Sequence, residues 1–190
     1  MAVYLISGGD DIAPAAVGLL GRGRYVMHDG AVDDDAHQTL RPTQELGSHF
    51  VVVAHGSADG TIRWYKSERA TAENWIWMGM ANPPQGVRIY LYCCHVGKHL
   101  PDLLAGCEAF GHLDSVPIPN GASDALILDF LDQVDELVTQ EPFDREEWRR
   151  RLITYVEAAY AAEVEQPSAD GFLGAPTLFL LLKSLGYQGG

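Results

Sequence analysis

Short, nearly continuous apolar runs recur along the chain, and glycine, proline or polar residues close each of them. The strongest is HFVVVAHG at 49–56, which contains three consecutive valines. Runs of this length that are apolar at almost every position are typical of strands buried on both faces of a sheet. The pattern predicts strands over 2–7, 24–30, 49–56, 87–93 and 107–113. A run over 61–67 follows an Ala-Asp-Gly turn and predicts half of a hairpin.

Longer segments lie between these runs and carry their apolar residues at helical spacing. The clearest is SDALILDFLDQVDELV at 123–138, which has one apolar face. The sequence also predicts a polar loop over 31–47 and helices over 12–21, 71–81 (capped by Thr71), 98–106 and 143–164. The apolar segment 177–186 fits either a helix or a strand.

Strands that alternate with helices predict an α/β sandwich around a mostly parallel sheet. The chain has 190 residues, 47% of them hydrophobic, and shows no internal repeat, so we expect a single domain over 1–190. In such sheets the functional site forms where loops leave the carboxyl ends of the strands. The residues that follow each strand are therefore the first candidates for chemistry.

Two strand ends carry reactive side chains. The strand 49–56 ends in His55 and Gly56, and the strand 87–93 leads into Cys94. If the two strands are parallel neighbours, a histidine and a cysteine meet at one edge of the sheet, as a thiol nucleophile and its base require. A helix that begins after Cys94 would favour the thiolate. The N–H groups of Gly56 and Cys94 would then form an oxyanion hole.

Each of these residues also has a structural explanation. A cysteine at the end of a buried strand is often a small core residue, and a histidine there is often a hydrogen-bonded polar group without a catalytic role. Alternation puts Cys93 and Cys94 on opposite faces of the sheet. Because we expect both faces to be covered, alternation alone does not choose between the two cysteines.

The order of these elements resembles the caspase-like cysteine peptidases, the group that holds caspases, metacaspases, separases, gingipains and CHAT peptidases. In that group a strand ends in His-Gly, a hairpin and a helix follow, and the next strand ends in the nucleophilic cysteine. The chain has VVVAHGS, then SADGTIRWYKS, then a Trp-rich segment, then VRIYLYCCHVG. Its Cys-Cys-His-Val-Gly is similar to the metacaspase stretch Asp-x-Cys-His-Ser-Gly. The stretch 110–134 is similar to a CHAT-type strand, loop and helix.

The resemblance covers roughly 50–138, about half of the chain, and implies a three-layer α/β/α sandwich of caspase-like type. It implies a cysteine endopeptidase in which Cys94 is the nucleophile and His55 the base, so that Cys93 is a core thiol. Tyr92 and Val96 depart from the motif, because metacaspases carry aspartate and serine there. The segment 142–190 matches no part of the family.

The loop after the strand 107–113 bears on substrate preference. In caspases this loop brings an arginine that suits an acidic substrate residue, whereas here it carries Asp114 and no basic residue. A buried, unpaired carboxylate there would favour arginine or lysine before the scissile bond, as in metacaspases and gingipains. The alternative is that Asp114 only caps a turn, and Asp59 and Asp124 are lesser candidates for substrate binding.

A zinc site is another use of the cysteines and histidines. The side chains that offer zinc ligands are those of Cys94, His95, His99, Cys107 and His112. No Cys-x-x-Cys pair is present. His95 and His99 have the spacing of the metalloprotease pattern His-Glu-x-x-His, but its glutamate is missing and Pro101 follows closely. We therefore expect no metal and no organic cofactor, with His95 a loop residue near the nucleophile and Cys107 a structural residue.

The formal net charge of −13 makes some classes of binding partner unfavourable. It repels phosphate backbones and anionic membranes, so we expect neither nucleic acid nor a membrane as partner. We expect a peptide or protein substrate, and a regulatory protein partner is left open. Three cysteines, two of them adjacent, do not suit a disulfide framework, and we recognise no signal peptide, so we expect a cytoplasmic protein.

Two other functions fit the same residues. One is a non-catalytic caspase-like module for binding or assembly, and the other is a thiol hydrolase acting on a small amide or ester. The presence of both His55 and Cys94 favours an enzyme over the binding module.

Overall fold

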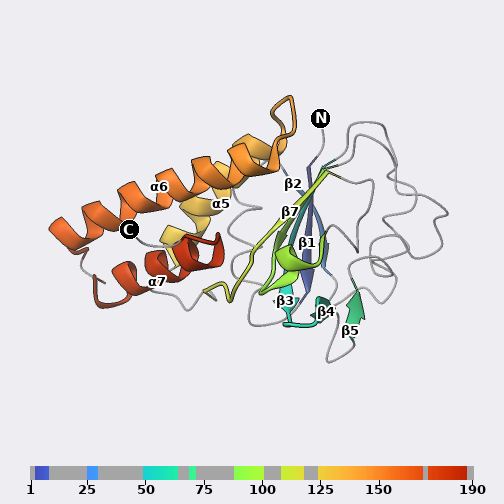
Figure 1. The fold of residues 1–190 in the computed structure, drawn as a ribbon, viewed down its shortest axis with the longest axis horizontal. Coiled ribbons are helices and arrows are strands. Elements are labelled where there is room, and N and C mark those ends of the chain that lie inside the picture. Colours follow the sequence, from blue (N-terminus) through green and yellow to red (C-terminus); the bar gives the residue numbers. More distant parts are fainter. Residues whose placement is uncertain are drawn as a thin grey trace.

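The fold is known from a computed structural model. The residues it describes are 3–8, 25–29, 49–63, 69–71, 88–100, 108–117, 124–168 and 171–187. In this part of the chain the strands come first and the long helices last (Figure 1).

Parallel pairing dominates the sheet. Its parallel strands are β1 (Val3–Gly8), β2 (Tyr25–Asp29), β3 (His49–Gly56), β6 (Arg88–Tyr92) and β7 (Glu108–Gly111). They lie in the spatial order β2-β1-β3-β6-β7. Two short strands, β4 (Thr61–Arg63) and β5 (Arg69–Thr71), extend from the end of β3 in antiparallel pairing.

The middle of this sheet lies where the sequence is most apolar. Every residue of β6 is buried, and Val51 and Val53 of β3 are almost completely removed from solvent. A parallel strand with a neighbour on each side buries both of its faces, so it needs apolar side chains at nearly every position. The continuous apolar runs of β3 and β6 meet that requirement.

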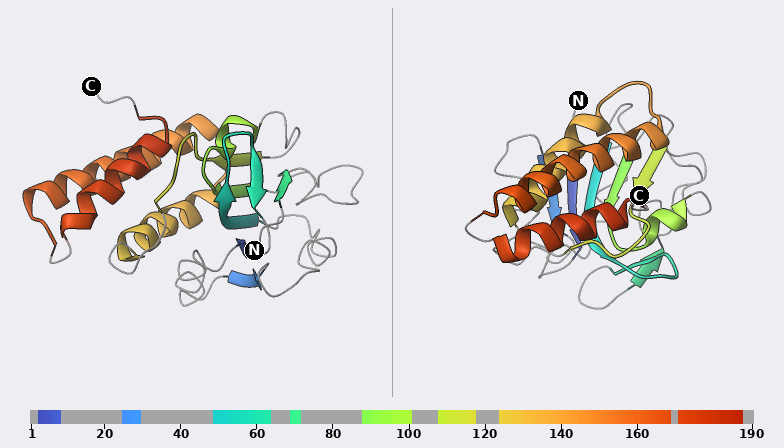
Figure 2. Two further views of the ribbon diagram at one scale, coloured as in Figure 1. Left: turned by 90° about the horizontal axis from the view of Figure 1, so that it is seen from below. Right: turned by 60° about the vertical axis from the view of Figure 1, so that its left-hand side comes forward.

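Three helices form a layer against one face of the sheet (Figures 1 and 2). They are α5 (Asp124–Val138), α6 (Arg145–Glu165) and α7 (Gly171–Ser184). At the start of α6, Asp144 Oδ1 accepts hydrogen bonds from the backbone N–H groups of Glu146 and Glu147 at 3.0 and 3.1 Å. The protein is therefore α/β, with a mostly parallel sheet and helices packed on it.

Aromatic side chains join the sheet to this helical layer. The ring of Tyr92 on β6 lies 6.3 Å from that of Phe130 on α5. The ring of Phe110 on β7 lies 6.4 Å from that of Trp148 on α6. Tyr92 on β6 and Phe110 on β7 thus turn towards the helices.

A buried arginine closes the amino end of β6. Arg88 is 1% exposed and forms ion pairs with Glu108 and Glu141, each at 2.6 Å. Its guanidinium also donates to the backbone carbonyl oxygens of Val138, at 3.2 Å, and Gln140. The end of α5 is thereby fixed to the sheet.

The sequence predicts most of these elements correctly. The five parallel strands, the hairpin after Gly60 and helices α5 and α6 are confirmed. The segment 177–186, which fits helix or strand by sequence, lies mainly in α7. The polar loop expected over 31–47 and the helix expected over 12–21 lie outside the described residues.

Two predictions differ from the structure. Thr71, expected to cap a helix, is the last residue of β5, a strand that the sequence did not predict. The helix expected over 98–106 is preceded by a 3-10 turn, η2 (Val96–Lys98). The remainder of both expected helices, 72–81 and 101–106, lies outside the described residues.

Candidate active site

The two strands that carry the candidate dyad are parallel neighbours. β3 pairs with β6 from His49 and Arg88 up to Val53 and Tyr92. Partner residues in this ladder differ by 39 in number, as Val53 and Tyr92 do. The same difference separates His55 from Cys94, so both residues lie just beyond the last paired positions, at the carboxyl edge of the sheet.

Gly56 lies against the backbone of Cys94. A Cβ atom on Gly56 would be 2.2 Å from the carbonyl oxygen of Cys94 and 3.0 Å from its nitrogen. Real Cβ atoms do not approach backbone atoms so closely, so this position requires glycine. The end of β3 therefore reaches the residue that follows β6. His55 is half-buried, and its backbone pairs with Arg63 of β4.

The two adjacent cysteines have different surroundings. Cys93 is 0% exposed and belongs to the hydrophobic core, which confirms its predicted role as a core thiol. Cys94 is half-buried, and its Sγ accepts a hydrogen bond from the backbone N–H of Val116 at 3.4 Å. Of the two, only Cys94 is partly exposed to solvent.

The chain turns sharply after Cys94. His95 has φ 62°, which is a left-handed conformation. Few residues other than glycine adopt it, although histidine does so more often than most. The N–H of Val96 donates back to the carbonyl of Cys94 at 2.8 Å. Gly97 follows, where a Cβ atom would be 2.4 Å from the carbonyl oxygen of Gly111. The turn is thus pressed against the end of β7.

Backbone hydrogen bonds join this turn to the loop that follows β7. The N–H of His95 donates to the carbonyl of Asp114 at 3.1 Å, and that of Gly97 to His112 at 2.8 Å. With the Val116 contact to sulfur, three bonds connect residues 94–97 to residues 112–116. The loop after β7 is therefore part of the candidate site.

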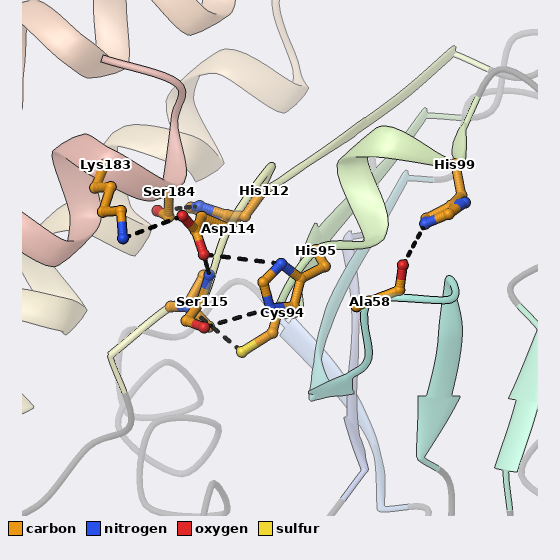
Figure 3. A network of polar contacts seen from close by, with 10 residues as sticks. Ala58, Cys94, His95, His99, His112, Asp114, Ser115, Lys183 and Ser184 are labelled. Carbon is orange, nitrogen blue, oxygen red and sulfur yellow. Dashed lines mark hydrogen bonds and ion pairs between the residues drawn. The ribbon is translucent and has the colours of Figure 1, made fainter. Parts of the chain in front are cut away.

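The imidazole of His95 lies between two polar groups of this loop (Figure 3). Its Nε2 is 3.4 Å from Ser115 Oγ, and its Nδ1 is 3.8 Å from Asp114 Oδ1. The second distance allows an ion pair but is too long for a hydrogen bond, and Nδ1 is buried without a hydrogen-bond partner. The structure confirms that His95 is a loop residue beside Cys94.

Asp114 has several partners. It accepts a hydrogen bond from the N–H of Ser115 at 2.8 Å, so it does cap a turn, and Lys183 Nζ of α7 lies 3.4 Å from Oδ2. The Ser115 bond lowers the pKa of Asp114 most, while slight burial raises it and Lys183 and His95 lower it further. Asp114 is therefore a charged, half-exposed carboxylate with a basic neighbour. It is not the buried, unpaired carboxylate that the sequence suggested.

The other acidic candidates are placed differently. Asp59 is exposed in the β3–β4 turn, where it accepts a hydrogen bond from Ser57 Oγ. Asp124 is the first residue of α5, and its side chain lies outside the described residues.

The histidines of the zinc alternative point to separate partners. His99 Nε2 lies 2.9 Å from the carbonyl oxygen of Ala58, and His112 is buried between Tyr90 and Ser184. Among the described residues, no group of three or more His, Cys, Asp or Glu side chains could hold a metal ion. Cys107 lies outside the described residues.

Sequence reasoning missed three residues that support the site. Lys183 and Ser184 end α7, about 70 positions from the loop that they contact, and His112 was considered only as a zinc ligand. No local pattern marks Lys183 or Ser184, because their contacts arise only when α7 packs on the sheet.

No protein-family model matches this chain, and no curated protein matches it either. None of the described helices combines the length and the apolar character that crossing a membrane requires.

Proposed function

We propose that the protein is a cysteine endopeptidase of caspase-like type, a single domain with a three-layer α/β/α fold. Its nucleophile is Cys94 and its base is His55. One observation carries the proposal: parallel neighbours β3 and β6 end at His55-Gly56 and Cys93-Cys94, with Gly56 against the backbone of Cys94. The carboxyl edge of a parallel sheet is where α/β proteins place their sites.

The reaction follows from these groups. His55 takes the thiol proton, and the sulfur of Cys94 attacks the carbonyl carbon of the scissile peptide bond. The N–H groups of Gly56 and Cys94 bind the resulting oxyanion. The protonated imidazole gives its proton to the leaving amine, which leaves a thioester. Water then attacks the thioester, releasing the carboxylic acid and the thiol.

We further propose that the enzyme cleaves after a basic residue. Asp114 is charged, half-exposed and located in the loop bonded to the Cys94 turn. Lys183 shows that this carboxylate accepts a cationic partner, and a substrate arginine or lysine would bind in the same way. Asp59 adds a second exposed carboxylate from the β3–β4 turn.

The test compares the two adjacent cysteines. Cys94→Ala is expected to lower the rate of peptide cleavage at least about a thousandfold, because it removes the nucleophile. Cys93→Ala, the matched control, is expected to keep most of the activity and to lower the melting temperature instead. Iodoacetamide is expected to modify Cys94 in the native protein faster than Cys93.

Three outcomes would contradict the proposal. Equal loss from both substitutions with lowered melting temperatures would identify a structural cysteine pair. Alkylation of Cys94 no faster than that of Cys93 would favour a non-catalytic binding module. Hydrolysis of small thioesters, esters or amides without cleavage of any member of a peptide library would favour a small-molecule thiol hydrolase.

A further inference from the structure

The last turn of α7 is fixed to the loop at residues 112–117. The backbone N–H of Leu113 donates to the carbonyl of Ser184 at 2.7 Å, and His112 Nδ1 lies 2.7 Å from Ser184 Oγ. On the outer side, Lys183 Nζ is 3.4 Å from Asp114 Oδ2 (Figure 3). Three consecutive loop residues are therefore held by two consecutive helix residues.

The contact between His112 and Ser184 is buried, and its hydrogen bonds are consistent with only one placement of the protons. His112 and Ser184 are 0% exposed. Ser184 Oγ donates to the carbonyl of Leu181 at 2.7 Å, so it accepts from His112 Nδ1–H. His112 Nε2 must then accept from the hydroxyl of Tyr90, 2.5 Å away. Only a neutral imidazole satisfies all three bonds.

The titration of the same groups supports this arrangement. Burial, together with the charge of Arg149, lowers the pKa of His112 to about 3, so the ring is neutral at ordinary pH. Burial first, and then the charges of Tyr92 and Cys93, raise the pKa of Tyr90 well above its usual range, so its hydroxyl stays a donor.

The far side of the same loop holds the candidate nucleophile. The N–H of Val116 donates to Cys94 Sγ at 3.4 Å, and the carbonyl of Asp114 accepts the N–H of His95 at 3.1 Å. A displacement of the loop would lengthen or break the bond to sulfur. The contacts thus run without a break from α7, through 112–116, to the sulfur.

We propose that the last turn of α7 positions the 112–117 loop against Cys94, with Ser184 and Lys183 as positioning residues that act through the loop. The inference rests on the proposed function insofar as Cys94 is the nucleophile. The Val116 N–H fixes the position of the Cys94 sulfur, so the place of the loop determines how the thiol is presented to a reagent or substrate.

The experiment measures the rate at which iodoacetamide modifies Cys94 in the intact protein, followed by mass spectrometry across the pH range. Ser184→Ala is expected to slow alkylation of Cys94 at neutral pH about three- to tenfold, because the displaced loop no longer holds the sulfur in place. Lys183→Met is expected to act in the same direction by about twofold at low salt, and by less at high salt, which screens the exposed ion pair with Asp114. Lys183→Arg is expected to behave like the wild type.

Leu178→Ala is the matched control, because Leu178 is buried earlier on α7 and is 1% exposed. It is expected to lower the melting temperature without moving the alkylation profile. Unchanged profiles in both Ser184→Ala and Lys183→Met would overturn the inference, as would an equal shift in Leu178→Ala. If Ser184→Ala does not fold, the exposed Lys183 decides the test alone. Alkylation needs no peptide substrate, so a wild type that cleaves no peptide would contradict the proposed function and leave this result standing.

Discussion

The two ends of β6 carry polar groups of very different character. At the amino end, Arg88 is buried and bound by two carboxylates and two backbone carbonyls. At the carboxyl end, Cys94 and His95 are half-buried, His95 adopts a left-handed conformation, and its Nδ1 lacks a hydrogen bond. We call the amino end of β6, at Arg88, the closed end, because its polar groups are bonded within the protein. We call the carboxyl end, at Cys94 and His95, the open end.

This comparison distinguishes a residue that holds the fold together, Arg88, from the residues of the candidate site. A buried charge that is fully hydrogen-bonded contributes to the fold and has no bonding capacity left for a ligand. The imidazole of His95, by contrast, has only long contacts, at 3.4 and 3.8 Å, and its buried Nδ1 makes no hydrogen bond. In parallel sheets the carboxyl end of the strands is the end that carries such groups.

The largest expected effect on stability lies at the closed end. Arg88→Met leaves the backbone carbonyls of Val138 and Gln140 without their donor, and at about 1–3 kcal/mol for each unsatisfied carbonyl it is expected to lower the free energy of unfolding by about 2–5 kcal/mol. Urea denaturation measures this loss. Arg150→Met is the matched control, because its pair with Glu147 is exposed and three residues apart, and it is expected to change little. Equal losses would contradict the comparison.

The next effect is a dependence of stability on pH from the buried layer beneath the open end. His112 has a pKa of about 3 in the fold, so between pH 3 and the ordinary histidine value the unfolded chain binds the proton and the folded chain does not. Stability from this group is present above that window and is lost as the pH falls through it. Between pH 7 and pH 4 we expect a loss of about 3 kcal/mol.

The measurement compares urea denaturation of the wild type and His112→Gln across that range. Glutamine keeps polar atoms near Tyr90 and Ser184 but does not titrate. The variant is expected to show a shallower fall in stability than the wild type. Identical slopes would show that other groups cause the acid sensitivity.

Gly56 tests the contact between the two strand ends. Gly56→Ala is expected to lower the free energy of unfolding by about 1–3 kcal/mol and to slow alkylation of Cys94, because its Cβ meets backbone atoms that have no room to move. Gly174→Ala is the matched control and is expected to lose less stability, because its Cβ would meet the side chain of Glu163, which can move at the cost of its exposed hydrogen bonds with Ser168. Thermal denaturation of both variants decides, and a fully stable Gly56→Ala would contradict the close packing of the strand ends.

The smallest expected effect concerns specificity at the open end. Asp114→Ala is expected to reduce the preference for arginine before the scissile bond about tenfold, the magnitude of one charge-assisted contact. Fluorogenic peptides that differ only at that position measure it, with Asp59→Ala assayed alongside. Faster cleavage after aspartate or leucine than after arginine by the wild type would refute the basic preference. An unchanged preference in Asp114→Ala would exclude this carboxylate.

The sequence by itself determined the strands, two of the long helices and the order of the candidate residues. The valines of β3 and the amphipathic repeat of α5 are local patterns, and burial on one or both faces imposes such patterns directly. The His-Gly and Cys-Cys-His stretches are likewise visible without a structure, because each follows an apolar run. The short strand β5 escaped prediction because three residues carry too little pattern.

Only the tertiary structure decided which strands are neighbours and which groups surround the thiol. The burial of Cys93 and the contact of Cys94 with Val116 depend on how the loop after β7 folds over the sheet. Lys183 and Ser184 reach that loop only because α7 packs beside it. Contacts between residues far apart in the chain result from the packing of whole elements, and no local periodicity records them.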